Sequence, residues 1–345
     1  MKNRLMKAIP GILLGFVVMV PAQGQATKKN VAGGGYTVSR TPDGQPDLQG
    51  IWTNATLTPL QRPLELGSKA FYTPKEAKEL EKQGLDSINS DRTDGDGAAK
   101  LGRNYNEFWK DRGGFVPSRR TSLITDTADG RIPPLTPQGQ KIADARDERR
   151  KLHPSDGPEF RNAFERCIVA SNAGPPMMPY NYNSNFQIVQ IPGYVIIFSE
   201  QIHDARVIPL DGRPHLPPNV HQWKGDSRGH WEGNTLVVET TNFTGKTNFF
   251  SINFQVNIDS ESLRLMERFT RTRPDMILYQ FTVDDPAIFT KPWTAEMPLN
   301  STDGPIFEYA CHEANQGLAN MLSAARAEEK AAPKPVTRSS SKNDR

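Results

Sequence analysis

Short runs rich in β-branched and aromatic residues follow one another from about residue 186 to residue 310. Turn pairs such as Pro192-Gly193 and Gly233-Asn234 separate these runs, and no helical periodicity intervenes. Consecutive strands with hairpin-length gaps are typical of antiparallel architectures. We therefore expect a mainly β fold, a calycin-like antiparallel barrel or a sandwich of about eight strands. The expected strands are residues 186–190, 194–200, 202–210, 235–243, 263–272, 276–284, 293–299 and 306–310.

Charged residues share strand faces with apolar residues in three of these runs, because successive side chains point to opposite faces. The three faces are Leu263, Leu265, Glu267 and Phe269; Ile202, Asp204, Arg206 and Ile208; and Tyr194, Ile196, Phe198 and Glu200. If these faces line one barrel, its lumen contains Glu200, Asp204, Arg206 and Glu267 in an apolar wall. Glu239 fits either face of its run.

Two interpretations of these inward charges remain open. Burial raises carboxylate pKa values, which makes acid/base chemistry near neutral pH possible. In that case Asp204 and Glu267 are the candidate acid and base, and Arg206 orients an anion or oxyanion. Alternatively, Arg206 forms a buried ion pair with Asp204 or Glu267 that holds the strands in register.

Histidines concentrate in residues 202–233, which contain His203, His215, His221 and His230 out of six in the chain. Loops at a barrel mouth commonly carry binding groups. His203 and His221 are the candidate proton shuttles, although a regular strand places His203 opposite Asp204 unless Gln201 forms a bulge. Each histidine is alternatively exposed or a capping group.

Aromatic residues near the same stretch suggest a pocket for a flat or sugar-like ligand. The candidate ligand-binding residues are Trp223, Trp231, Glu200, His230 and Trp293. The tryptophans are alternatively ordinary core residues. No H-E-x-x-H pair, Walker loop, G-x-G-x-x-G or G-x-S-x-G is present, so we expect no metal and no cofactor.

The first half of the chain, residues 27–164, has low hydrophobicity and many turn residues. Thr73 and Glu76 form a capping box that predicts a helix ending near Gly84. A second helix is expected from Thr136 to about residue 152, and a shorter one over 158–166. Residues 86–104 resemble a surface loop. We expect this half to wrap a β domain at 165–330 rather than to form its own core.

Both termini have distinctive composition. Residues 1–26 combine a basic start, an apolar stretch at 8–20 and small residues at 22, 24 and 26, which predicts a signal peptide. Since the chain is +3 and this leader has three basic and no acidic residues, the mature part is near neutral. Neutral charge gives no case for nucleic acid, and no other run is long enough for a transmembrane span. A helix at 315–330 precedes a tail, 331–345, expected to be disordered.

Cys167 and Cys311 are the two cysteines of the chain. In an oxidising compartment such a pair is expected to form a disulfide. The alternative is two separate buried thiols.

Several stretches resemble one family of exported bacterial proteins, frequent in acidobacteria and proteobacteria. They are PDGQPDLQGIW (42–52), ERC (165–167), IHDARVIPLDGRPH (202–215), GDSRGHWEGNTLVVETTNF (225–243), ERFTR (267–271) and DDPAIFTKPWT (284–294). The resemblance implies a periplasmic or outer-membrane-associated location in a Gram-negative cell. It implies no particular activity and no catalytic residue.

Three function classes follow from these observations. The first is an exported, cofactor-independent acid/base enzyme acting on a small aromatic or sugar-derived compound by C–O cleavage, elimination or isomerisation. The second is a calycin-like periplasmic protein that binds an apolar small ligand without catalysis. The third is an envelope scaffold with an exposed apolar patch and no pocket. The composition leaves the oligomeric state open.

Overall fold

The structure is a computed structural model that describes residues 36–88, 113–114, 118–170, 172–180, 182–246, 260–313 and 315–331. The expected signal peptide, the expected surface loop from residue 89 onward and the expected disordered tail from residue 332 lie outside these residues.

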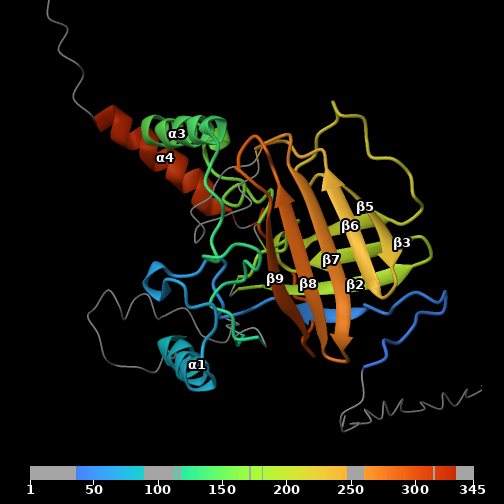
Figure 1. Ribbon diagram of the computed structural model, residues 1–345. Coiled ribbons are helices and arrows are strands. Elements are labelled where there is room, and N and C mark those ends of the chain that lie inside the picture. The colour runs from blue at the N-terminus through green and yellow to red at the C-terminus, as the bar shows by residue number, and fades with distance from the viewer. Residues whose placement is uncertain are drawn as a thin grey trace, which may run out of the picture. The chain divides into compact units, whose positions relative to one another are not determined.

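Nine antiparallel strands form one strongly curved sheet in the order β4-β3-β2-β1-β9-β8-β7-β6-β5 (Figure 1). The first five strands are β1 (Gly50–Thr53), β2 (Asn185–Ile191), β3 (Tyr194–Ser199), β4 (Asp204–Pro209) and β5 (Asp226–Glu232). The others are β6 (Thr235–Thr241), β7 (Arg264–Arg273), β8 (Met276–Asp284) and β9 (Trp293–Ser301). The predicted mainly β, antiparallel, barrel-like fold is confirmed.

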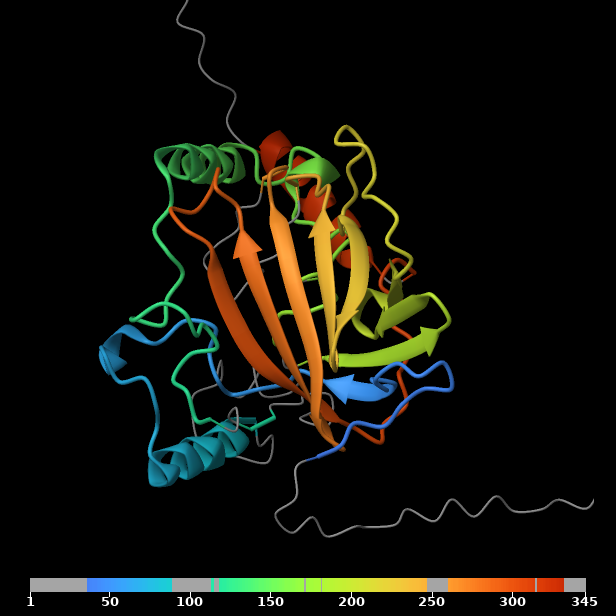
Figure 2. The same cartoon turned by 45° about the vertical axis from the view of Figure 1, so that its right-hand side comes forward.

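The sheet is nearly closed at its two edge strands, β4 and β5, as the turned view shows (Figure 2). A Cβ added at Gly229 on β5 would lie 2.9 Å from Ile208 Cγ2 and 2.8 Å from Leu210 Cδ2. Side chains from the end of β4 therefore pack directly on the β5 backbone, where glycine leaves the space they need.

Two strands, β1 and β5, were not predicted from the sequence. β1 lies in the middle of the sheet, between β2 and β9, with Trp52 opposite Phe186 and Ser301. β5 falls within the histidine-rich stretch, where polar residues and Gly229 hide the strand pattern. The predicted strand at 306–310 is wrong, because β9 is already paired on both sides by β1 and β8.

The helices agree with the capping signals in part. α1 (Pro74–Ile88) begins with the expected capping box, in which Thr73 N donates to Glu76 Oε2 over 2.8 Å. It continues past Gly84, so the predicted end is wrong. α3 (Pro137–Leu152) matches its prediction, and its Thr136 hydroxyl accepts from Gly139 N.

Residues 158–166 contain a short 3-10 helix, Pro158–Phe160, followed by turns rather than the expected α-helix. α4 (Gln316–Ala331) confirms the predicted C-terminal helix. Leu318 N donates to Asn315 Oδ1 over 3.2 Å, so Asn315 caps this helix.

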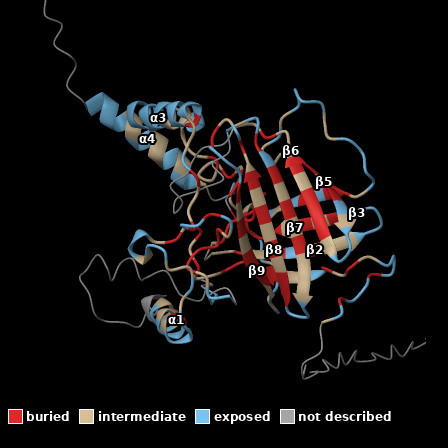
Figure 3. Cartoon of the chain, viewed as in Figure 1, coloured by how far each residue is buried: buried red, intermediate tan, exposed pale blue. Residues whose placement is uncertain are grey.

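A single core fills the sheet, with buried and partly exposed residues alternating along β7 and β8 (Figure 3). Residues of the N-terminal half join it: Leu48, Leu60, Leu123 and Ile124 are buried in the same cluster. None of the helices within the described residues has the length and apolar character needed to cross a bilayer.

Candidate functional site

A buried ionic group lies inside the sheet where the alternation predicted inward charges. Glu267 on β7 is fully buried, and its Oε2 lies 2.9 Å from Nη1 of Arg206 on β4. The Tyr279 hydroxyl on β8 donates to Glu267 Oε1 over 2.7 Å and accepts from Met177 N over 3.0 Å. Burial first, and then the Glu267 charge, raise the pKa of Tyr279 well above its ordinary value. This hydroxyl therefore keeps its proton and donates a hydrogen bond to the carboxylate.

Asp204 lies apart from that pair. Its Oδ2 forms a 2.6 Å ion pair with Lys224 Nζ, and the Asp204 side chain is 46% exposed whereas Lys224 is 14% exposed. Asp204 thus pairs with Lys224 at the rim, whereas Glu267 pairs with Arg206 in the interior. Sequence reasoning missed Lys224 because it lies in an irregular connection, where no alternation indicates its direction.

Lys224 has a pKa below its ordinary value of 10.5. Burial is the main cause; Asp204 opposes the shift and the positive charge of Arg206 adds to it. An amine that loses its proton more easily than a free lysine is suited to proton transfer closer to neutral pH.

Replacing Lys224 by methionine is expected to change how stability depends on pH. The folded state binds this proton less readily than the unfolded state, so the wild type gains stability with rising pH until the unfolded value of 10.5 is passed. The difference in unfolding free energy between wild type and Lys224→Met should therefore move in favour of the wild type as pH rises. Urea denaturation of both proteins across the alkaline range measures it; a pH-independent difference would contradict the argument.

Glu200 is buried, but not by the strand face predicted for it. The inward residues of β3 are Val195, Ile197 and Ser199, so the face of Tyr194, Ile196 and Phe198 points away from the core. Glu200 follows the end of β3 in an α-helical conformation. Its carboxylate accepts from the amides of Asn183 and Asn185 over 2.6 and 2.7 Å. This carboxylate therefore closes a turn rather than joining Glu267.

The histidines are dispersed. The His203 ring packs edge-on against Phe198 with centroids 4.7 Å apart, and His221 donates from Nδ1 to the Phe243 carbonyl over 3.0 Å. His230 is exposed, with Nε2 3.3 Å from Glu232 Oε1. No group of three or more His, Cys, Asp or Glu residues suited to a metal ion occurs among the described residues.

The three candidate tryptophans have different environments. Trp293 is fully buried between Phe281 and Phe289, with ring centroids 5.8 and 6.0 Å away, so it belongs to the core. Trp231 packs against that core from β5 and is partly buried. Trp223 lines a cavity outside the sheet.

This cavity has a volume of about 790 Å³ and lies between α3, the turns at 158–166 and the connection that carries Trp223. Six cations line it: Arg146, Arg149, Arg150, Arg161, Arg166 and Lys246. The acidic lining residues are Glu159 and Glu165. We call this space the basic cavity. The helical spacing of Arg146, Arg149 and Arg150 was a visible signal, because residues three and four apart share one helix face.

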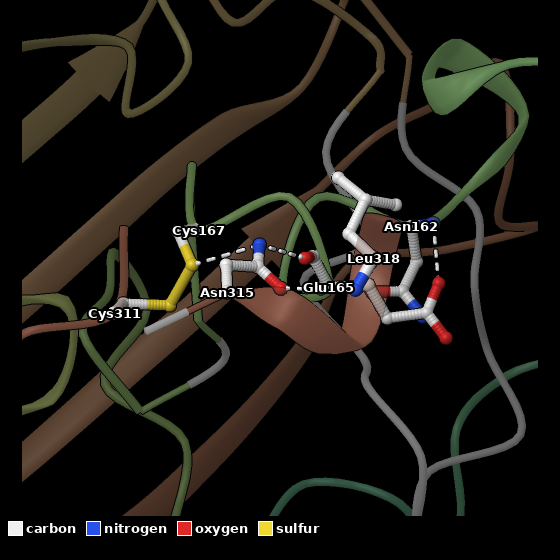
Figure 4. Close-up of a disulfide and its surroundings, with 6 residues drawn as sticks. All are labelled: Asn162, Glu165, Cys167, Cys311, Asn315 and Leu318. Carbon is white, nitrogen blue, oxygen red and sulfur yellow. Dashed lines mark hydrogen bonds between the residues drawn. A yellow bond between two sulfur atoms is a disulfide. The ribbon is translucent and has the colours of Figure 1, made fainter. Parts of the chain in front are cut away.

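A disulfide joins Cys167, which follows the lining residue Arg166, to Cys311, and the predicted pairing is confirmed (Figure 4). Asn315, at the start of α4, donates to the Glu165 carbonyl over 2.8 Å. Arg161 Nη2 contacts Met321 of α4 at 3.1 Å. The C-terminal helix is thereby fastened to the turns that carry Arg161 and Arg166.

No family model, no curated protein and no solved structure matches the chain.

Proposed function

We propose that this chain is an exported binding protein for a small organic molecule, which it holds in the basic cavity beside Trp223. The volume of about 790 Å³ carries the proposal, since ligand sites of small molecules enclose roughly 300–1,000 Å³. Trp223 and Phe160 supply aromatic surface, and the surrounding cations supply polar contacts. The leader-like residues 1–26 and a disulfide, which persists in oxidising compartments, support export.

The interior of the sheet is a less suitable ligand site than the basic cavity. Glu267 is engaged by Arg206 and Tyr279, and it has no exposure to solvent. A substrate in the interior would have to displace one of these partners and leave a buried charge uncompensated.

Mass spectrometry of small molecules released from protein purified from its own host tests the proposal. We expect one compound at near-equal molar amount, and its loss from a Trp223→Ala variant that still folds. Trp231→Ala is the matched control, because Trp231 lies on β5 and does not line the basic cavity. Protein that retains no compound, or an equal loss from both variants, would overturn the proposal.

An acid/base enzyme is the second candidate, and the Lys224–Asp204 pair beside Arg206 favours it. This pair offers a buried amine with a lowered pKa next to a carboxylate at the rim. Turnover of the retained compound, absent from a Lys224→Met variant that still binds it, would decide in favour of catalysis.

A further inference from the structure

Two arginines of the basic cavity are held by aromatic rings instead of carboxylates. The Arg149 guanidinium carbon lies 4.3 Å from the ring centroid of Phe160. The Arg166 guanidinium carbon lies 5.9 Å from the ring centroid of Trp223. A guanidinium over the face of an aromatic ring is attracted to the ring without using its N–H donors, so these donors stay available to a ligand.

The neighbouring arginines are already engaged. Arg161 donates to both carboxylate oxygens of Glu165, over 3.0 and 2.7 Å. Arg146 donates to the Gly245 carbonyl over 2.7 Å, and Arg150 to Asp147 over 2.6 Å. Among the residues that the structure describes, Arg149 and Arg166 have no carboxylate partner.

The pairing of the lining residues determines the net charge that a ligand meets in the cavity. Glu165 is neutralised by Arg161, which leaves Glu159 as the acidic lining residue outside that pair. The cavity wall therefore has a positive excess. An apolar ligand would desolvate these cations without compensation, at a cost in free energy. An oxyanion would instead accept charge-assisted, fork-like hydrogen bonds from the guanidinium groups.

We infer that the ligand of the basic cavity is a small organic oxyanion that is bound by Arg149 and Arg166. The inference rests on the proposed function and replaces the apolar ligand expected of a calycin-like binder. Carboxylates, phosphates and sulfates share the chemistry that a guanidinium recognises, so the inference names oxyanions as the class.

Calorimetric titration with terephthalate and with succinate tests the inference, using dimethyl terephthalate as the uncharged counterpart. We expect at least one dianion to bind the wild type and the diester not to bind. Arg149→Gln and Arg166→Gln should each weaken binding about tenfold or more, as expected when a charge-assisted hydrogen bond is lost. Inorganic phosphate should compete with the bound dianion.

Arg273→Gln is the matched control, because Arg273 is half-exposed, pairs with Asp275 and does not line the cavity. Thermal unfolding and circular dichroism establish that each variant is folded. Equal affinity of the control and both cavity variants, binding of the diester, or no dianion binding to the wild type would overturn the inference. A neutral compound retained in a Trp223-dependent manner would overturn the inference alone and leave the proposed function standing.

Discussion

Glu267→Gln is expected to destabilise the fold by about 3–5 kcal/mol, because it leaves the Arg206 guanidinium buried without a counter-charge. Glu267 is fully buried and the Arg206 side chain is 7% exposed, so water cannot take over the lost interaction. The Tyr279 hydroxyl also loses its charged acceptor. Urea denaturation monitored by tryptophan fluorescence measures the change in unfolding free energy.

Two further variants separate burial from charge. Glu239→Gln removes a carboxylate from an ion pair in which Arg264 is 54% exposed and Glu239 31% exposed. This control should change stability by only about 0–1 kcal/mol. The double variant Arg206→Met, Glu267→Leu removes both charges and should recover much of the loss. A Glu267→Gln protein as stable as the wild type would show that the pair is not needed for the fold.

Replacing Cys167 and Cys311 together by serine is expected to cost about 2–5 kcal/mol, because the disulfide closes a long loop in the unfolded chain. The two cysteines are 144 residues apart in sequence. The same change removes one of the links between the chain before α4 and the turns at 158–166, so it should also weaken binding in the basic cavity. Denaturation of the oxidised wild type and the double variant gives the difference in stability.

A reducing agent provides the control for this variant. It should lower the unfolding midpoint of the wild type to that of the double serine variant and leave the variant unchanged. Equal midpoints of the oxidised wild type and the variant would show that the contacts of Asn315 and Met321 hold α4 without the bond.

The strand pattern predicted most of the sheet because residue alternation on β7 reports burial directly. Leu265, Glu267 and Phe269 are all fully buried, so a carboxylate among apolar neighbours did indicate the interior. The same reasoning misplaced the inward face of β3, since Val195 and Ile197 are as apolar as Ile196 and Phe198. Where both faces are apolar, neighbouring strands decide which one is inside: Ile197 pairs with Arg206 and Ile188.

The candidate site was harder to predict, for a physical reason. The basic cavity is built from α3 and the turns at 158–166, which are neighbours in sequence, together with Trp223 and Lys246, which lie far from them in sequence. A local sequence pattern indicates periodicity and helix caps, but it does not indicate which residues far apart in sequence come into contact. Trp223 was among the predicted ligand-binding residues, whereas Arg149, Arg166 and Lys224 were not. The spacing of Arg149 on α3 shows which helix face it shares, but the contacts of all three residues depend on tertiary packing.

The position of β1 has a consequence for how the chain reaches its folded state. Strands β2–β4 pair with neighbours in sequence, and so do β5–β9. β1 is separated from β2 by a long stretch of chain, and it joins the two groups by pairing with β9. Pairings between distant residues form late, because the intervening chain must first be ordered. During synthesis, β1 emerges early and then waits for residues 293–301. A ribosome stalled before that point would hold a chain whose first strand has one bare edge, the kind of surface on which other chains aggregate.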